Sequence, residues 1–210
     1  AEVDRLRREG HLVLDLRAAA LYGAGHIAGA LNIGLGGQFA TWAGTLINAG
    51  TPLILVAEDE AHVDEALMRL ARVGIESVAG YLSGGMSAWE EAQLETAAIP
   101  QISVDELKER IERGEDLQVI DVRRPAEYSD GHVPRAASMP LSMELAKQVA
   151  QTAQLDQKRP TAIICAGGYR SSAATSLLEQ HGFHHLLNVT GGTGAWVRAG
   201  HPVEATELRG

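Results

Sequence analysis

Cys165 is the only cysteine in the chain, and its sequence surroundings favour a reactive thiolate. Residues 161–164 predict a short buried strand, and a glycine-containing loop leads from Cys165 into a helix predicted over 170–181. A thiol at such a strand-to-helix turn faces backbone N–H groups that have no intrahelical partner, and it lies at the positive end of the helix dipole. Arg170 adds a permanent positive charge. We therefore expect a nucleophile rather than the alternative, an inert buried cysteine.

The composition is that of an ordinary globular protein, because 45% of the 210 residues are hydrophobic and 21% are charged. A formal net charge of −9 argues against a nucleic-acid-binding surface. No apolar run approaches the roughly 20 residues of a membrane span, and the N-terminus has no secretory hydrophobic segment. A single cysteine cannot form an internal disulfide, so we expect a cytoplasmic protein. From the net charge and the lack of a long apolar run, we expect neither a nucleic-acid nor a membrane partner.

The sequence contains an internal repeat whose offset, read from Asp15 and Asp121, is 106 residues. The matching pairs are segments 11–17 and 117–123, segments 52–56 and 160–164, Tyr22 and Tyr128, Gly25 and Gly131, His26 and His132, Gly74 and Gly182, and Trp89 and Trp196. An offset of this size fits two copies of one small domain. We place these domains at residues 1–97 and 98–210.

Each copy alternates short apolar strands with amphipathic helices, which predicts an α/β fold: a small, mainly parallel sheet flanked by helices. In open parallel sheets, sites form beyond the carboxyl ends of the strands, which is where Cys165 stands. The predicted strands of the second copy are 102–104, 118–121, 136–138, 162–165 and 186–189, and its helices are 104–113, 125–129, 142–151 and 170–181.

The first copy lacks the residues that make the second copy reactive. In a gap-free alignment, Ala57 stands in place of Cys165 and His62 in place of Arg170. Residues 58–60 between them are all acidic, and carboxylates there would repel an anionic substrate. We predict that this copy is inactive and serves either as a docking or spacer module or as a structural partner of the second copy.

The first copy also begins without a counterpart of the strand predicted at 102–104, since residues 1–9 already predict its first helix. The first residue is Ala rather than Met. We expect that the chain was cut from a longer polypeptide; the alternative is simple processing of a protein whose first copy is shortened.

Several short motifs follow one another in an order that is typical of a known family. They are Asp121-Val122-Arg123, Glu127-Tyr128, Gly131-His132, the loop Cys165-Ala166-Gly167-Gly168-Tyr169-Arg170-Ser171, Gly191-Gly192 and Trp196. Together they resemble the rhodanese family, and the resemblance implies two rhodanese-like domains in tandem, of which the second is active. The order of the copies is also similar to the C-terminal part of proteins that fuse a metallo-β-lactamase-fold persulfide dioxygenase to rhodanese domains, which implies such an upstream domain as a partner.

The resemblance implies a sulfurtransferase that works without a cofactor or a metal. The Cys165 thiolate would attack the outer sulfur of thiosulfate or glutathione persulfide, and the resulting persulfide would pass its sulfur to cyanide or a thiol. Two glycines let the loop amides point inward and form an anion-binding nest. The implied substrate-binding residues are Ala166, Gly167, Gly168, Tyr169, Arg170, Ser171 and Arg123.

Individual roles follow from the side chains. Arg170 is expected near the donor oxygens or the persulfide, and Ser171 is expected to cap the helix and donate to sulfur. Arg123 either contacts the substrate or forms an internal salt bridge. Asp121 recurs as Asp15 in the copy without a nucleophile, which favours a structural role for both.

Two other functions compete with catalysed sulfur transfer. Cysteine phosphatases cradle a tetrahedral phosphate in a Cys-x5-Arg loop, but the spacing from Cys165 to Arg170 is Cys-x4-Arg, and the shorter ring suits a sulfur better. The second alternative is a module of the same fold that carries sulfur or binds other proteins with little turnover. The degenerate first copy shows that loss of activity is tolerated in this chain.

Overall fold

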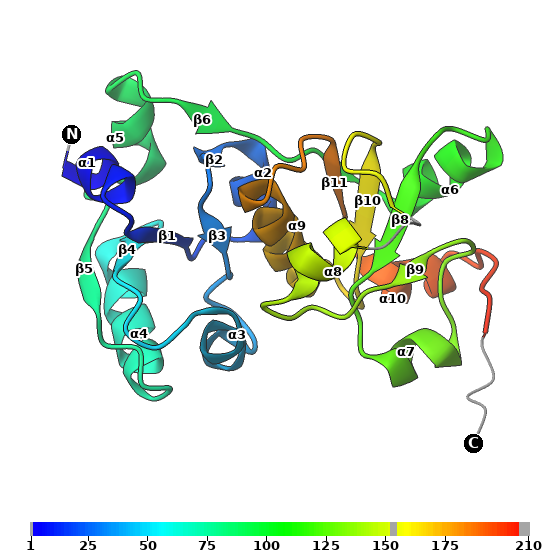
Figure 1. Ribbon diagram of the computed structural model, residues 1–210, viewed down its shortest axis with the longest axis horizontal. Helices are drawn as coiled ribbons and strands as arrows, with labels where there is room; N and C mark the ends of the chain where they lie inside the picture. The colour runs from blue at the N-terminus through cyan, green and yellow to red at the C-terminus, as the bar shows by residue number, and fades with distance from the viewer. Residues whose placement is uncertain (1, 152–154, 206–210) are drawn as a thin grey trace. The chain divides into compact units, whose positions relative to one another are not determined.

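The computed structural model describes residues 2–151 and 155–205, and it divides into two compact units (Figure 1). Unit 1 spans residues 1–98 and unit 2 spans residues 99–210. Each unit has its own parallel sheet whose strands are connected by helices. The expected tandem α/β fold is therefore confirmed.

Unit 1 is built on a four-stranded sheet. Its elements in chain order are α1 (Glu2–Arg8), β1 (Leu12–Asp15), α2 (Ala19–Ala24), β2 (His26–Ile27), β3 (Leu31–Asn32), α3 (Phe39–Leu46), β4 (Leu53–Val56), α4 (Glu60–Ala71), β5 (Val78–Tyr81), α5 (Gly85–Glu91) and β6 (Thr96–Ala97). The strand order is β3-β1-β4-β5, and all three pairings are parallel. The short strands β2 and β6 form a separate antiparallel pair.

Unit 2 repeats this plan, and its sheet has five strands where the main sheet of unit 1 has four. Its elements are β7 (Gln101–Ile102), α6 (Val104–Glu112), β8 (Gln118–Asp121), α7 (Pro125–Asp130), β9 (Ala137–Ser138), α8 (Leu145–Gln151), β10 (Thr161–Ile164), α9 (Tyr169–Gln180), β11 (Leu186–Val189) and α10 (Gly192–Arg198). The strand order is β7-β11-β10-β8-β9, again entirely parallel.

Three inner strands of the two sheets, β4, β8 and β10, are buried along their whole length. Every residue of β4, β8 and β10 is inaccessible to solvent or nearly so. β4 is a continuous run of apolar residues, as expected for a parallel strand covered on both faces, whereas β8 and β10 also bury the polar residues Gln118, Asp121 and Thr161. β10 pairs with β8 so that Ile164, its last residue, lies opposite Asp121. The chain leaves both strands at the same edge of the sheet, where Cys165 follows.

The strand β7 has no counterpart among the described residues of unit 1. β5 is therefore an edge strand in unit 1, whereas its equivalent β11 is covered by β7 in unit 2. The consequence is visible in burial, since β5 is half-exposed and β11 is almost fully buried. The expectation that the first copy lacks this strand is confirmed for the described part of the chain.

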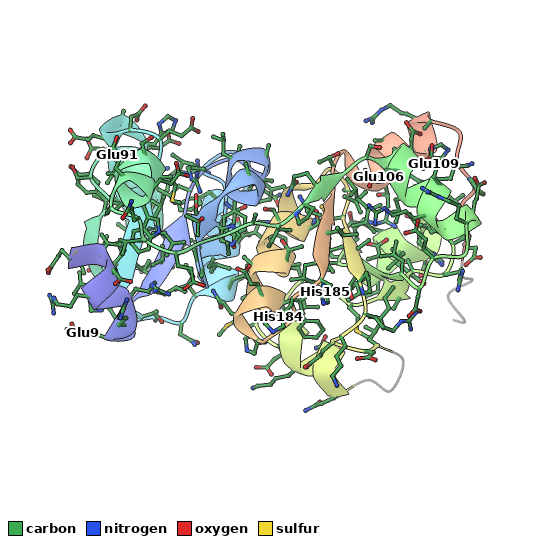
Figure 2. All side chains as sticks on the ribbon, turned by 90° about the horizontal axis from the view of Figure 1, so that it is seen from above. Glu9, Glu91, Glu106, Glu109, His184 and His185 are labelled. Atoms are coloured by element: carbon green, nitrogen blue, oxygen red, sulfur yellow. The ribbon has the colours of Figure 1, made fainter. Side chains whose placement is uncertain are left out.

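The surface is rich in charged side chains, in keeping with the net charge of −9. Glu9, Glu91 and Glu109 are all exposed, and Figure 2 shows them on the outside of the ribbon. No helix within residues 2–151 and 155–205 is long and apolar enough to cross a membrane.

Candidate active site

Cys165 directly follows the last residue of β10, at the carboxyl edge of the unit 2 sheet. Its side chain is buried, whereas the next two loop residues, Ala166 and Gly167, are exposed. Gly168 adopts a left-handed conformation with φ of 97° and is the N-cap of α9. An L side chain rarely takes this conformation, so a glycine is needed where the chain turns from the loop into the helix. Tyr169 is the first residue of α9 and is half-buried.

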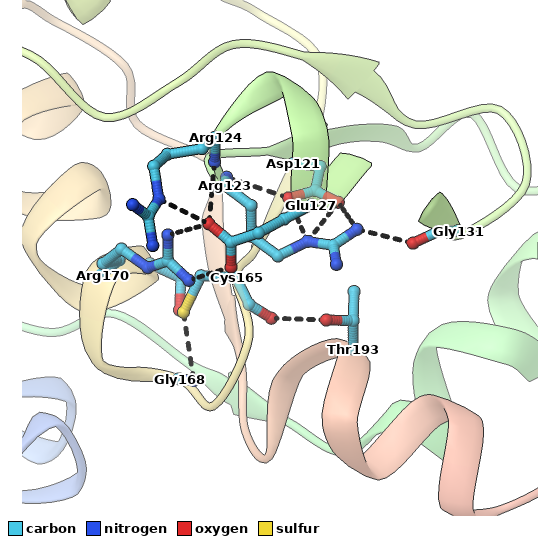
Figure 3. Close-up of polar contacts among 10 residues, drawn as sticks. Asp121, Arg123, Arg124, Glu127, Gly131, Cys165, Gly168, Arg170 and Thr193 are labelled. Carbon is cyan, nitrogen blue, oxygen red and sulfur yellow. Dashed lines mark hydrogen bonds and ion pairs between the residues drawn. The ribbon is translucent and has the colours of Figure 1, made fainter. Parts of the chain in front are cut away.

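The sulfur of Cys165 lies against the start of α9. The backbone N–H of Gly168 donates to Sγ over 3.1 Å (Figure 3). Sγ also lies 3.5 Å from the Ser171 hydroxyl oxygen. Ser171 contacts the sulfur, but the expected direction is reversed, because the thiol donates and the Ser171 hydroxyl accepts. The expectation that Ser171 caps the helix is wrong, because the left-handed turn at Gly168 starts the helix before Ser171 is reached.

The start of α10 holds the loop from the other side. The backbone N–H of Thr193 donates to the Cys165 carbonyl over 2.8 Å, and that of Gly194 donates to the Ala166 carbonyl over 3.0 Å. A Cβ at Gly192 would lie 2.2 Å from the Cys165 carbonyl oxygen, so only glycine permits this approach. These two hydrogen bonds fix the backbone of Cys165 and Ala166 against α10.

Arg170 forms an ion pair with Glu127, a residue of α7. Its two terminal nitrogens donate to both carboxylate oxygens of Glu127 over 2.8 and 2.7 Å, as Figure 3 shows. The guanidinium of Arg170 lowers the pKa of Glu127 to about 2, while the carboxylate raises the pKa of Arg170. Both groups therefore remain charged at any physiological pH. The backbone N–H and the Nε of Arg124 also donate to Glu127.

Glu127 was not among the predicted site residues, although the sequence carried a signal for it. The repeat aligns Glu127 with Leu21 and Arg170 with His62, so both members of the ion pair are absent from the copy that lacks the cysteine. Because Glu127 and Arg170 are replaced in the same copy that lacks the cysteine, the three residues are indicated as parts of one site.

Arg123 was predicted to contact the substrate or to form an internal salt bridge, and the structure shows the salt bridge. Its guanidinium donates to both carboxylate oxygens of Asp121 and to the Gly131 carbonyl, and both side chains are buried. Unit 1 contains the same arrangement between Arg17 and Asp15. Its presence in the unit without a nucleophile favours a structural role.

The equivalent turn in unit 1 encloses a pocket of about 270 Å³. The buried Ala57 replaces the cysteine, and Asp59 caps α4 by accepting from the backbone N–H of His62. Glu60, Glu58 and Asp59 all line the pocket, and the Tyr81 hydroxyl donates to Glu60. The pocket therefore contains no thiol, and its polar lining is acidic.

Among the residues that the structure describes, no three His, Cys, Asp or Glu side chains are grouped so that they could hold a metal ion. His184 and His185, which lie before β11, are exposed (Figure 2).

Comparison with known proteins links both units to one family. The family model of the rhodanese-like domain matches residues 1–92 and 103–199. A sulfurtransferase of Allochromatium vinosum is 32% identical over 109 residues, which are 52% of this chain and 98% of that protein. The thiosulfate sulfurtransferase GlpE of Pseudoalteromonas translucida is 32% identical over 102 residues, 49% of this chain and 92% of the relative.

A third relative has a different description. The putative sulfur carrier protein YrkF of Bacillus subtilis is 31% identical over 107 residues, 51% of this chain. The match spans 56% of that relative's length.

Proposed function

The chain belongs to the rhodanese-like domain family, and from this premise we propose that unit 2 is a sulfurtransferase whose nucleophile is Cys165. The observation that carries the proposal is the position of the Cys165 sulfur at the start of α9, where the Gly168 amide donates to it. Unit 1 has no thiol at the equivalent turn and takes no part in the chemistry.

The proposed reaction has two half-reactions. In the first, the Cys165 thiolate attacks the outer sulfur of thiosulfate or a thiol persulfide, a new S–S bond forms, and sulfite or a thiolate leaves. In the second, cyanide or a thiol attacks the outer sulfur of the enzyme persulfide, and the Cys165 thiolate leaves. The chain has no second cysteine, so the sulfur must pass to an acceptor outside the chain.

The loop geometry supports a persulfide intermediate. A terminal persulfide is an anion, and it is stabilised by amides that point at it and by the positive end of a helix. The Gly168 amide already faces the sulfur, and α9 begins at the next residue. The inward amides predicted for Gly167, Tyr169, Arg170 and Ser171 remain a prediction.

Mass spectrometry of the intact chain tests the proposal. After exposure to thiosulfate or glutathione persulfide, we expect one added sulfur atom on a peptide that contains Cys165. A subsequent addition of cyanide should remove it and yield thiocyanate. A chain that gains no sulfur from either donor would contradict the proposal.

The second candidate function is a sulfur carrier or protein-interaction module with little turnover. The description of the Bacillus relative as a putative sulfur carrier favours it. The two functions differ in kinetics: a carrier would load one sulfur per chain but release thiocyanate no faster than a free low-molecular-weight persulfide does. A metallo-β-lactamase-fold domain upstream of unit 1 would supply a persulfide-oxidising partner, and it remains a prediction from the resemblance alone.

A further inference from the structure

We propose that Glu127 makes the unit 2 site selective for thiol persulfides over thiosulfate, because it neutralises the only cation of the active loop; the proposal rests on the sulfur transfer proposed above. Arg170 is the single charged residue between Cys165 and Ser171. In the structure its terminal nitrogens face the carboxylate of Glu127 in a bidentate pair. The cation expected to attract an anionic donor is therefore already paired.

The pair is held in place by more than its own two hydrogen bonds. The Glu127 carboxylate also accepts from the backbone N–H of Arg124 at the start of α7 and from the Nε of the same residue, whose side chain is exposed to solvent. The side chains of Arg170 and Glu127 are only 15% and 27% exposed, so solvent screens their interaction weakly. A donor that takes the place of the carboxylate on these two nitrogens must displace a group that is anchored on a second element, and a donor that binds the remaining N–H groups meets a guanidinium whose charge is already balanced.

The two donor classes place different charges beside the reacting sulfur. In thiosulfate, a sulfonate group is bonded directly to the sulfur that Cys165 attacks, and the ion carries two negative charges. In a persulfide such as glutathione persulfide, an uncharged S–CH₂ group takes this place, and the carboxylates lie several bonds away. A site whose arginine is neutralised by a carboxylate disfavours the first donor much more than the second.

Unit 1 shows that this carboxylate is not required by the fold. The helix α2 of unit 1 is equivalent to α7, and its residue at the position of Glu127 is Leu21, which is 44% exposed. The unit that lacks the cysteine thus builds the same helix without the acid. This pattern indicates that Glu127 serves the site rather than the scaffold.

Both loading reactions balance without an oxidant or reductant. With thiosulfate, Cys–S⁻ and S₂O₃²⁻ give Cys–S–S⁻ and SO₃²⁻: the S–S bond to the thiol forms and the bond to the sulfonate sulfur breaks. With a protonated persulfide, Cys–S⁻ and GSSH give Cys–S–S⁻ and GSH, and the leaving thiolate takes the persulfide proton. Glu127 acts only through Arg170, and it is therefore a positioning residue.

The test compares kcat/KM for the two donors in the wild-type chain and in Glu127→Gln, with release to cyanide as the common second step. We expect the wild type to favour glutathione persulfide at least about tenfold. Glu127→Gln retains a carbonyl oxygen to accept from Arg124 and Arg170 but removes the charge. It should raise kcat/KM for thiosulfate about tenfold, mainly through a lower KM, and change the glutathione persulfide value by less than about twofold.

Two further variants separate charge from structure. Glu127→Asp keeps the charge and should keep the wild-type donor ratio. Glu106→Gln is the matched control, since it removes one carboxylate from another arginine ion pair of unit 2, that with Arg110, and should leave both donors unaffected. A wild type that favours thiosulfate, or a Glu127→Gln variant that changes both donors equally, would overturn the inference. If neither donor loads Cys165, the sulfurtransfer itself fails.

Discussion

The separate sheets of units 1 and 2 contain four strands in the same order. The two units differ at the turn that follows β4 in unit 1 and β10 in unit 2. In unit 2 the turn carries a thiol and two glycines, and Arg170 follows in the first turn of α9. In unit 1 the turn is one residue shorter before α4 begins, and Asp59 caps that helix in the ordinary way. The comparison separates what the scaffold needs from what the chemistry needs.

Both units contain the same buried ion pair and the same stacked ring pair outside this turn. Each unit has a buried Asp–Arg pair after its first central strand, Asp15 with Arg17 and Asp121 with Arg123. Each also stacks a tyrosine ring on a histidine ring four residues later, with centroids 3.8 Å apart in unit 1 and 3.6 Å in unit 2. These interactions survive in the unit without a nucleophile. They therefore stabilise the fold irrespective of catalysis.

The largest expected effect is the loss of the nucleophile. Cys165→Ser should reduce thiocyanate formation from thiosulfate and cyanide to the uncatalysed rate, since the chain has no other thiol. Ala57→Ser at the equivalent turn of unit 1 is the control and should leave the rate within about twofold of the wild type. Substantial activity in Cys165→Ser would show that the nucleophile has been assigned to the wrong residue.

The next effect concerns the glycine at the start of the last helix in each unit. A Cβ at Gly192 would lie 2.2 Å from the Cys165 carbonyl oxygen, whereas one at Gly85 would lie 3.4 Å from the Ala57 carbonyl oxygen. Gly192→Ala must displace the active loop, and a displacement near 1 Å lowers sulfur transfer by about 100-fold. Gly85→Ala should cost about 1 kcal/mol of unit 1 stability, from its left-handed backbone, and leave turnover unchanged.

Equal effects of these two alanine variants on turnover would show that the contact between α10 and the loop does not position the thiol. Circular dichroism of both variants checks that each unit has folded.

The buried ion pairs should respond alike in the two units. Asp15→Asn and Asp121→Asn each leave a buried arginine without its counter-charge, which should lower the free energy of unfolding of the unit concerned by about 3 kcal/mol. Urea denaturation followed by circular dichroism measures this loss. If Asp121→Asn cost far less than Asp15→Asn, the pair in unit 2 would have a role that its twin lacks.

The smallest expected effect is that of adding a thiol to unit 1, which should not create sulfurtransferase activity there. In a Cys165→Ser background, Ala57→Cys should restore almost no sulfur transfer, because Glu58, Asp59 and Glu60 would repel an anionic donor and disfavour the thiolate. Grafting residues 165–170 in place of 57–62 is the companion experiment and should restore some activity. Activity near that of native unit 2 from Ala57→Cys alone would mean that the missing thiol is the only defect of unit 1.

Much of this architecture could be predicted from the sequence because its determinants are local. The strands at 118–121 and 186–189 have the predicted bounds, since short apolar runs between turn residues mark them clearly. The helix predicted from Ser142 begins only at Leu145, after a turn in which the Leu145 amide bonds to the Ser142 carbonyl.

Contacts between distant residues could not be predicted in the same way. The Glu127–Arg170 pair joins residues 43 apart, and Gly192 lies against the Cys165 carbonyl although α9 and β11 separate the two residues in the chain. No local pattern encodes either contact, because each depends on how α7 and α10 pack at the carboxyl edge of the sheet. The comparison of the two copies, position by position, points to the first contact, because Leu21 and His62 replace Glu127 and Arg170, but not to the second, because Gly85 matches Gly192.

The burial of Cys165 has a consequence for the size of the molecules that can react with it. Its side chain is 1% exposed, so the bare thiol can be reached only by small or slender reagents. An added sulfur lengthens the side chain by one S–S bond, roughly 2 Å. In the proposed reaction the donor must reach the buried thiol, whereas the acceptor reaches the outer sulfur, one bond farther from the backbone. An acceptor that is too large to reach the buried thiol could therefore still react with the outer sulfur of the persulfide.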